Sequence, residues 1–281
     1  DKYNSLQSAL AGAERLVPLL EEEDRHMADE IPDEFKHIES IRFDHVWFSY
    51  ENNDIYALED FTLNIKAGEF IGIVGPSGSG KSTLLALLMG VYKPTKGTIY
   101  INGINIANYD SSVLRHLMGY VFQQAYLFKG SIRDNLTLFD TSISNEEMIN
   151  AVKQVNLDSM IEQLPEGYET PVGYLGSLLS DGQKQLLAFG RTLIKKTPIL
   201  LLDEATANID SHTEKQIQAS IENIRGSKTI VSIAHRLSTV KDANKIVYME
   251  YGKIIEIGSF DELINLKGAF YNLWNNQHSG S

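Results

Sequence analysis

The residues with the clearest chemical potential form a glycine-rich run at positions 75–82. The run is Gly75, Pro76, Ser77, Gly78, Ser79, Gly80, Lys81 and Ser82. Its spacing is that of a phosphate-binding loop. Glycines let backbone N–H groups approach phosphate oxygens closely, and Lys81 adds a positive charge for the β- and γ-phosphates. The Ser82 hydroxyl is a suitable ligand for Mg²⁺.

The flanking residues supply the context that such a loop requires. An apolar run at 70–74 indicates a buried strand before the loop, and residues 83–89 indicate a helix after it. The positive end of that helix dipole would face the phosphates. The alternative is a glycine-rich turn ahead of an ordinary core helix.

Two adjacent carboxylates end another apolar run. Residues 199–202 are Ile, Leu, Leu and Leu, and Asp203 and Glu204 follow them. In phosphate-loop enzymes an Asp at this strand end helps to hold Mg²⁺. The neighbouring carboxylate can orient or deprotonate a water molecule. An acidic turn after a strand is common by itself, but together with the loop it indicates phosphoryl transfer to water.

The composition restricts the class of protein. The chain has 281 residues, of which 43% are hydrophobic, enough for one large domain or for a domain with an embedded subdomain. The formal net charge of -12 disfavours nucleic acid as the main partner. The absence of cysteine excludes disulfides and Cys-based zinc sites and fits a reducing compartment. We recognise neither a signal peptide nor an apolar run long enough to span a membrane.

Strands and helices alternate around these motifs. Strand-like apolar patterns occur at 41–50, 57–65, 70–74, 97–101, 117–122, 198–202, 228–233 and 245–249. Helical patterns occur at 83–89, in several segments between 131 and 192, and at 210–224 and 258–276. This order favours an α/β fold with a mainly parallel core sheet. Residues 1–20 also have helical spacing, and the acidic stretch at 21–30 indicates a solvated linker.

Further motifs accompany the loop and the carboxylates. Residues 179–183 are Leu, Ser, Asp, Gly and Gln, which resembles the LSGGQ signature of the ABC transporter ATPases. Tyr50 matches the aromatic residue that stacks on adenine in that family, and Gln123 matches the glutamine that links Mg²⁺ to the transmembrane domains. Residues 207–210 resemble the D-loop, and His235 matches the switch histidine. All these motifs follow the order of the family.

The resemblance, which covers about residues 38–277, implies a complete ATP site. It implies ATP binding by Tyr50, Gly75, Pro76, Ser77, Gly78, Ser79, Gly80, Lys81, Ser82 and Thr83. It implies Mg²⁺ ligation by Ser82, Gln123 and Asp203, and catalysis by Glu204, His235 and Gln123. It implies contacts with the ATP of a second domain from Ser180, Asp181, Gly182, Gln183 and Asp210. The plainer alternatives are a core aromatic for Tyr50, a strand-end hydrogen bond for Gln123 and a structural role for His235.

The resemblance also implies the architecture. We expect a P-loop ABC ATPase fold with a mainly parallel core sheet, an antiparallel β subdomain and an inserted helical subdomain at about residues 125–192. Residues 127–136 resemble the exporter version of the family, and residues 9–23 resemble the end of an exporter's last transmembrane helix and its linker. We therefore assign residues 1–37 to that helix end and linker, and residues 38–281 to the nucleotide-binding domain. An amphipathic helix packed on the domain is the alternative for the N-terminal residues.

The expected function is that of a multidrug- or lipid-exporter-like half-transporter. Such a domain hydrolyses ATP, dimerises with a second nucleotide-binding domain and serves transmembrane domains at the cytoplasmic face of a bacterial plasma membrane, while in isolation it would be soluble. The alternatives are an importer subunit, which would lack the tail at 9–23, and a non-transport ABC ATPase, which would carry a long coiled coil or zinc cysteines. A phosphate-loop kinase would lack the signature.

Residues at two places in the chain depart from the family pattern. Asp181 replaces the first glycine of the signature, and Tyr174 and Leu175 stand where exporters usually have Glu and Arg. The residues that this chain gives to its own ATP all match the family, whereas the motif for the partner's ATP does not. We therefore expect a heterodimeric exporter with two unequal sites, with a homodimer as the alternative. The resemblance implies that membrane helices choose the transported substrate.

Overall fold

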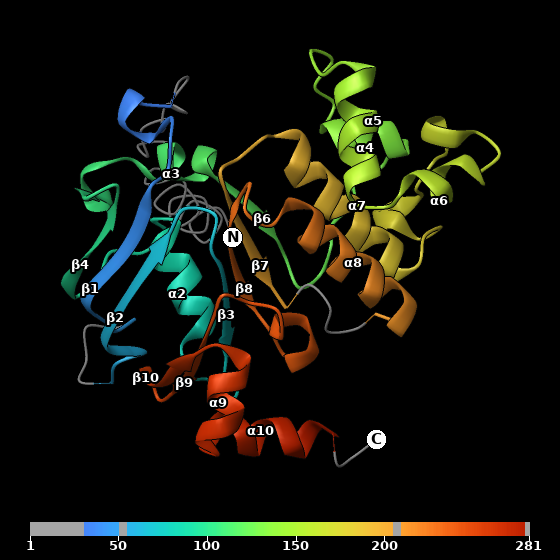
Figure 1. The fold of residues 1–281 in the computed structure, drawn as a ribbon. Coiled ribbons are helices and arrows are strands. Elements are labelled where there is room, and N and C mark those ends of the chain that lie inside the picture. Colours follow the sequence, from blue (N-terminus) through green and yellow to red (C-terminus); the bar gives the residue numbers. More distant parts are fainter. Residues whose placement is uncertain (1–30, 51–54, 205–208, 279–281) are drawn as a thin grey trace, which may run out of the picture. The chain divides into compact units, whose positions relative to one another are not determined.

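The computed structural model describes residues 31–50, 55–204 and 209–278 (Figure 1). The chain divides into two units, residues 1–30 and 31–281. The predicted helix at 1–20, the acidic stretch at 21–30 and the turn at 52–54 lie outside the described residues. The first element of the described part is a short 3₁₀ turn, Asp33–Phe35.

The core sheet of the described chain has six strands. In spatial order they are β10 (Lys253–Gly258), β9 (Lys245–Glu250), β3 (Phe70–Val74), β8 (Thr229–Ile233), β7 (Ile199–Asp203) and β6 (Met118–Val121). All neighbours pair in parallel except β10, which pairs antiparallel with β9. Every residue of β3 and of β8 is buried, as expected for parallel strands covered on both faces. The prediction of a mainly parallel core sheet is therefore confirmed.

The sequence analysis assigned no strand to the segment that forms β10. Its residues alternate between exposed and half-buried, and the strand lies at the edge of the sheet. Its three isoleucines, Ile254, Ile255 and Ile257, were a usable strand signal. At the edge of the sheet Ile255 and Ile257 stay exposed.

A second sheet in the described part is antiparallel and has four strands. Its spatial order is β2 (Leu58–Lys66), β1 (Ser40–Phe48), β4 (Lys96–Ile101) and β5 (Ile104–Asn105). The residues of β2 alternate between buried and exposed, which is the pattern of a sheet with one covered face. The sheet follows the predicted strands closely, and an antiparallel β sheet beside the core is confirmed.

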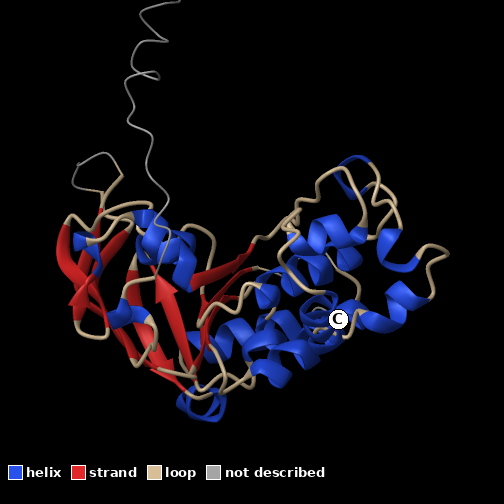
Figure 2. Cartoon of the chain, turned by 90° about the horizontal axis from the view of Figure 1, so that it is seen from above, coloured by secondary structure: helices blue, strands red, loops and turns tan. Residues whose placement is uncertain are grey.

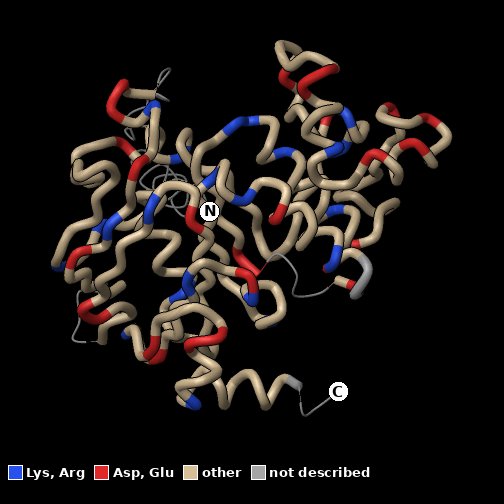
Figure 3. The backbone as a smooth tube through the Cα atoms, in the orientation of Figure 1, with Lys and Arg blue, Asp and Glu red and all other residues tan. Residues whose placement is uncertain are grey.

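The helices cover the core sheet and extend beyond one side of it. In chain order they are α2 (Lys81–Leu88), α3 (Ser111–Leu117), α4 (Ile132–Thr137), α5 (Asn145–Gln154), α6 (Asp158–Glu162), α7 (Asp181–Ile194), α8 (Ser211–Ile224), α9 (Phe260–Leu266) and α10 (Ala269–His278). Seen from above, the strands gather on one side and most of the helices on the other (Figure 2). Acidic and basic residues are spread over both parts (Figure 3).

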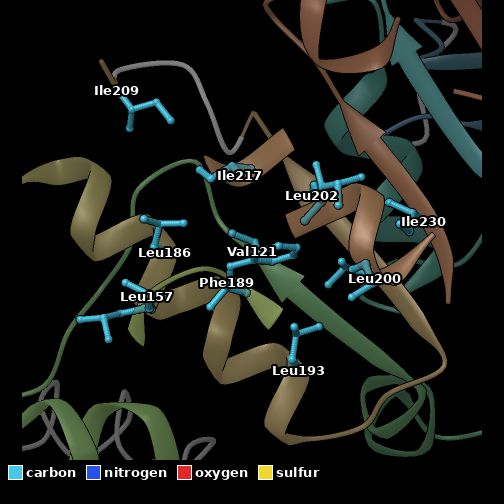
Figure 4. Packing of buried hydrophobic residues seen from close by; sticks show 14 of the residues in the cluster. Val121, Leu157, Leu186, Phe189, Leu193, Leu200, Leu202, Ile209, Ile217 and Ile230 are labelled. Atoms are coloured by element: carbon cyan, nitrogen blue, oxygen red, sulfur yellow. The ribbon is translucent and has the colours of Figure 1, made fainter. Parts of the chain in front are cut away.

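Helix α7 joins the helical segment to the core sheet. Its hydrophobic residues recur at helical spacing and enter one buried cluster with residues of five strands of the core sheet. Figure 4 shows this packing, with Leu186, Phe189 and Leu193 from α7 beside Val121, Leu200, Leu202 and Ile230 from the sheet. Burial of each such side chain contributes about 1.5–3 kcal/mol. The N-terminus of α7 is thereby held in a fixed relation to the sheet.

The parallel strands present their carboxyl ends at one edge of the sheet. The glycine-rich loop follows β3, and the segment with Gln123 follows β6. Asp203 ends β7 with Glu204 next to it, and His235 comes two residues after β8. Ligands of open α/β sheets bind at this edge. Within the described ranges, no helix is both long and apolar enough to cross a membrane.

Candidate functional site

The glycines of the phosphate loop (residues 75–82) have distinct structural roles. A Cβ added to Gly75 would lie 2.0 Å from the carbonyl oxygen of Met249, and one added to Gly80 would lie 2.4 Å from that of Ala57. These two glycines therefore let the loop pack against neighbouring backbone. A Cβ on Gly78 would meet nothing within 4 Å, although its φ of +79° also favours glycine. The space beside Gly78 is therefore open, and this glycine is exposed.

Lys81 is the first residue of α2 and is held beneath the loop. Its Nζ donates hydrogen bonds to the carbonyl oxygens of Gly75 at 2.9 Å and Pro76 at 2.8 Å. Burial lowers the pKa of Lys81, and the negative charges of Glu204 and Asp203 partly oppose that shift. A phosphate group near the loop would add negative charge beside this ammonium group and so favour its protonated form.

The two carboxylates at the end of β7 each have a specific donor. The hydroxyl of Tyr120 donates to Oδ2 of Asp203 at 2.7 Å, and burial is the largest cause of the raised pKa of Tyr120. The amide Nε2 of Gln123 donates to Oε2 of Glu204 at 2.8 Å. Glu204 has a φ of +48°, which is unfavourable for a residue with a side chain, and its N–H donates to the carbonyl oxygen of Ile233 at 3.0 Å. Contacts between strands therefore fix the direction of both carboxylates.

Tyr50 lies beside the phosphate loop. Its hydroxyl and Oγ1 of Thr83 are 2.7 Å apart, and its ring meets Phe48 and Tyr92 edge-on at 4.9 and 5.3 Å. The residue is 57% exposed, so a ring face is available for a planar ligand. A cavity of about 280 Å³ is lined by Tyr50, Ala57, Ser77, Gly78, Gly80, Lys81, Ser82, Thr83 and Glu204. We call it the Tyr50 cavity.

A second cavity, of about 380 Å³, shares Ser77, Lys81 and Glu204 with the Tyr50 cavity. It is lined by Gly75, Pro76, Ser77, Lys81, Gln123, Glu204, Ala234, His235, Leu273 and Gln277. We call it the His235 cavity. The two cavities together bring the predicted loop, Tyr50, Gln123, Glu204 and His235 into one site.

The predicted signature residues lie at the N-terminus of α7 and do not line either of these cavities in the described structure. Ser180 is the N-cap of α7, since its Oγ accepts from the N–H of Gln183 at 3.2 Å and its own N–H donates to Oε1 of Gln183 at 2.9 Å. A Cβ on Gly182 would lie 2.6 Å from Oγ1 of Thr213, so this glycine permits close packing of α7 on α8. These three residues therefore have local structural roles.

Asp181 and Asp210 also have local partners. Oδ1 of Asp181 accepts from Nζ of Lys184 at 2.9 Å, and the Asp181 side chain is 72% exposed. Oδ1 of Asp210 accepts from the N–H of Thr213 at 3.0 Å, and its Oδ2 accepts from Oγ1 of Thr213 at 2.8 Å. Asp210 therefore caps the start of α8. The rest of the predicted D-loop, residues 205–208, lies outside the described residues.

Sequence reasoning missed residues that support the site from behind. Besides Tyr120, the buried Gln185 of α7 donates through Nε2 to the carbonyl oxygens of Phe122 at 3.1 Å and Gln123 at 2.6 Å. A Gln on the apolar face of a helix was a usable signal, because buried amides require hydrogen-bond partners. No comparable signal marked Tyr120, since a tyrosine in a strand is ordinary.

The residues present are suitable for Mg²⁺. Carboxylate, amide and hydroxyl oxygens, which are the ligands that Mg²⁺ prefers, are available from Asp203, Gln123 and Ser82. Because Gln123 uses Nε2 toward Glu204, its Oε1 is the amide atom left for a cation. No group of three or more His, Asp or Glu that could hold a metal occurs in the described ranges. Sites that bind Mg²⁺ together with nucleotide phosphates need only one or two carboxylates.

The phosphate loop lies between a buried parallel strand and a helix, and a pair of carboxylates lies at the same edge of the sheet. This combination defines a phosphate-loop nucleotide-binding protein. Comparison with known proteins identifies the family. The family model described as ABC transporter matches residues 58–207. The chain belongs to the ABC transporter family and is an ATPase domain of it, so it binds ATP.

Individual relatives agree with this assignment. The chain is 39% identical over 279 residues to the uncharacterized ABC transporter ATP-binding protein YfiC of Bacillus subtilis, covering 99% of this chain and 46% of YfiC. It is 42% identical over 234 residues to the beta-(1-->2)glucan export ATP-binding/permease protein NdvA of Bartonella bacilliformis, covering 83% of this chain and 39% of NdvA. A solved structure of a bacterial Atm1-family ABC exporter with ATP bound matches with a TM-score of 0.85 and 36% identity, over 96% of this chain and 47% of that chain. The chain thus spans less than half the length of these relatives.

Proposed function

We propose that this domain binds Mg·ATP, hydrolyses it and thereby drives export of a substrate across a membrane. The observation that carries the proposal is the His235 cavity, because Lys81, Gln123, Glu204 and His235 all line it. Lys81 provides a cation for phosphate, and Glu204 provides a carboxylate base. Gln123 and His235 each provide a hydrogen-bond donor. Their association around one space is hard to explain by packing alone, since all four are polar.

We propose that nucleotide binding uses the Tyr50 cavity. Tyr50 would stack on adenine, while the loop amides and Lys81 hold the phosphates, assisted by Ser77, Ser79 and Thr83. Asp203, Ser82 and Oε1 of Gln123 would hold Mg²⁺. When bound, Mg²⁺ neutralises phosphate charge during the reaction. The hydrogen bond from Tyr120 to Oδ2 of Asp203 supports the role of Asp203 as a Mg²⁺ ligand, because it fixes the carboxylate and thereby the direction of Oδ1.

For hydrolysis we propose Glu204 as the catalytic carboxylate. It orients a water molecule and accepts its proton as the water oxygen bonds to the γ-phosphorus and the bond to ADP breaks. The donation from Gln123 Nε2 to Oε2 leaves Oε1 of Glu204 for the water. His235 would donate a hydrogen bond to the γ-phosphate. Positioning of this kind supplies most of the rate increase in phosphoryl transfer.

The partners that we propose are a second nucleotide-binding domain and the transmembrane domains of an exporter. Ser180, Asp181, Gly182, Gln183 and Asp210 would contact the ATP bound by the second domain. The names of NdvA and of the Atm1-family structure support export, and the short coverage of these relatives leaves room for transmembrane domains. The domain would then act at the cytoplasmic face of a bacterial plasma membrane. We keep the boundaries at residues 1–37 for the membrane-helix end and linker, 38–281 for the nucleotide-binding domain and about 125–192 for its helical subdomain.

Two variants test the proposal. Lys81→Ala should strongly weaken ATP binding to the 281-residue chain, measured by calorimetry with Mg²⁺ present. Glu204→Gln should keep ATP binding but abolish most hydrolysis in the complete transporter, because an amide has the shape of a carboxylate but cannot accept the proton. Unchanged ATP affinity in the first variant would refute the loop assignment. Wild-type turnover in the second would exclude Glu204 as the base.

A second candidate concerns the partner: we propose a heterodimer in which this chain contributes the weaker signature. Asp181 would face a γ-phosphate across the interface, and like charges about 5–6 Å apart at an effective dielectric near 20 repel by about 3 kcal/mol. Lys184, whose Nζ lies 2.9 Å from Oδ1 of Asp181, carries a positive charge that offsets part of this repulsion. One ATP site would be impaired while the domains still close.

The heterodimer has a direct test. A second exporter half encoded next to this chain, with an intact LSGGQ and its own catalytic Glu replaced, would support it. In that complex Asp181→Gly should raise ATP turnover. Export and ATP hydrolysis by a homodimer of the complete protein would instead show that Asp181 is a tolerated variant.

A further inference from the structure

The backbone around His235 is held by one side chain from the last helix of the chain. Nε2 of Gln277 on α10 donates to the carbonyl oxygen of His235 at 2.7 Å. Oε1 of the same amide accepts from the N–H of Leu237 at 3.1 Å. A single amide group therefore binds one acceptor and one donor, two residues apart. Such a two-point contact fixes both the position and the direction of the peptide segment between them.

The other side of the same segment is held by α8. Glu214, which is buried, accepts from Oγ of Ser238 at 2.8 Å and forms an ion pair with Arg236. Four consecutive residues, 235–238, are therefore tied by side chains from two helices. The His235 side chain is exposed toward the His235 cavity, so its ring depends on the backbone beneath it for its direction.

Helix α10 is itself firmly attached, so it can serve as a support. The N–H groups of Ala269 and Phe270 donate to the carboxylate of Glu256 on β10 at 2.5 and 3.0 Å. The Phe270 side chain is fully buried, and Trp274 meets Phe260 edge-on at 4.7 Å. The contact from Gln277 thus extends from a helix anchored on the core sheet.

We propose that Gln277 is a positioning residue that holds His235 in the direction needed for ATP hydrolysis. The inference rests on the proposed function, in which His235 donates to the γ-phosphate. It makes the C-terminal helix part of the ATP site, although 42 residues separate Gln277 from His235. Gln277 need not touch ATP, because it acts on the backbone that carries the histidine.

Three substitutions separate the hydrogen bonds from packing. Gln277→Met keeps the length of the side chain and removes both hydrogen bonds. Gln277→Glu keeps the acceptor for Leu237 and replaces the donor to His235 by a repelling oxygen. Asn276→Ala is the matched control, because Asn276 is an exposed neighbour on the same helix.

The first measurement is steady-state ATP hydrolysis by the complete transporter. Gln277→Met and Gln277→Glu should each lower kcat by about three- to tenfold, the range for loss of one or two hydrogen bonds, with KM for ATP changed less than about twofold. Asn276→Ala should keep the wild-type values. In a His235→Ala background, Gln277→Met should lower kcat no further, since the group that it positions is gone.

The second measurement is independent of catalysis. Hydrogen exchange of the 281-residue chain without nucleotide should be faster at the amide of Leu237 in Gln277→Met, and unchanged there in Asn276→Ala. Unchanged exchange would overturn the contact itself.

The remaining outcomes separate the two proposals. If Gln277→Met keeps the wild-type kcat, or lowers it equally with and without His235, Gln277 does not act through His235 while the proposed function stands. If His235→Ala itself keeps the wild-type kcat, the role of His235 in the proposed function is wrong, and the inference fails with it.

Discussion

Tyr120→Phe tests whether a neighbouring strand holds Asp203 in place. The hydroxyl of Tyr120 donates to Oδ2 of Asp203 at 2.7 Å, and the substitution deletes this one oxygen while keeping the ring. Hydrogen bonds to a charged acceptor contribute about 1.5–3 kcal/mol when they are buried. Asp203 is only half-buried, so water can replace part of the lost donor. We therefore expect a loss of about 1 kcal/mol in the free energy of unfolding.

That loss has a measurable size. For a chain of this length, about 1 kcal/mol corresponds to a fall in Tm of about 2–4 °C, which thermal denaturation followed by circular dichroism can detect. Asp203 would also lose its fixed direction, so the Mg²⁺ concentration for half-maximal ATP binding should rise by about three- to tenfold. Loss of a group that hydrogen-bonds to a metal ligand typically lowers metal affinity by about 10–100-fold, and the partial exposure of Asp203 places the expected effect at or below the lower end of that range.

The matched control is Tyr251→Phe, because Tyr251 is 86% exposed and loses an equivalent hydroxyl to solvent. It should change neither Tm nor the Mg²⁺ dependence. If Tyr120→Phe behaves like this control in both measurements, the hydrogen bond to Asp203 has no influence on stability or on cation binding, and our account of Tyr120 is wrong.

Two further predictions concern other parts of the chain. Gly80→Ala should destabilise the fold by more than Gly78→Ala, measured by chemical denaturation. Both positions have positive φ, which costs an alanine about 1–2 kcal/mol. Only at Gly80 would the added methyl group also clash with the carbonyl oxygen of Ala57. Equal losses would show that the clash is relieved without cost. Lys196→Ala should raise the pKa of Glu147 from about 2 toward its ordinary value, in an NMR titration, because the hydrogen bond from Lys196 is the largest cause of the shift. The stabilisation from this pair is present above the ordinary pKa of a glutamate and is lost as pH falls toward 2. A Glu147 pKa that does not move in the variant would contradict the assignment of the shift to Lys196.

Much of the site was predictable because its motifs are local in sequence. The phosphate loop combines a buried strand, glycines that accept positive φ and a following helix within about twenty residues, and each part has its own sequence pattern. The same is true of the apolar strand that ends at Asp203 and Glu204. Since carboxyl ends of parallel strands share one edge of a sheet, the order of the elements already brought these motifs together.

Other assignments failed or stayed incomplete because their cause is not local. The edge strand β10 contains three isoleucines, yet Ile255 and Ile257 are exposed, because its place at the edge of the sheet comes from pairing with β9. The signature glycine Gly182 matched a family motif, but its conformational need comes from Thr213 on another helix. No periodicity in one segment reports how closely a second helix will approach it.

The sequence by itself determined which groups are available: a phosphate loop, two carboxylates, a glutamine and a histidine, each at the end of a strand, and with them membership of a family. Only the tertiary structure decided which residues aim those groups. Tyr120 meets Asp203 across two strands, and Gln277 meets His235 from the last helix. Such pairs form because packing of the core brings distant segments within hydrogen-bonding distance, and that distance depends on the shape of the whole core, which no single stretch of sequence contains.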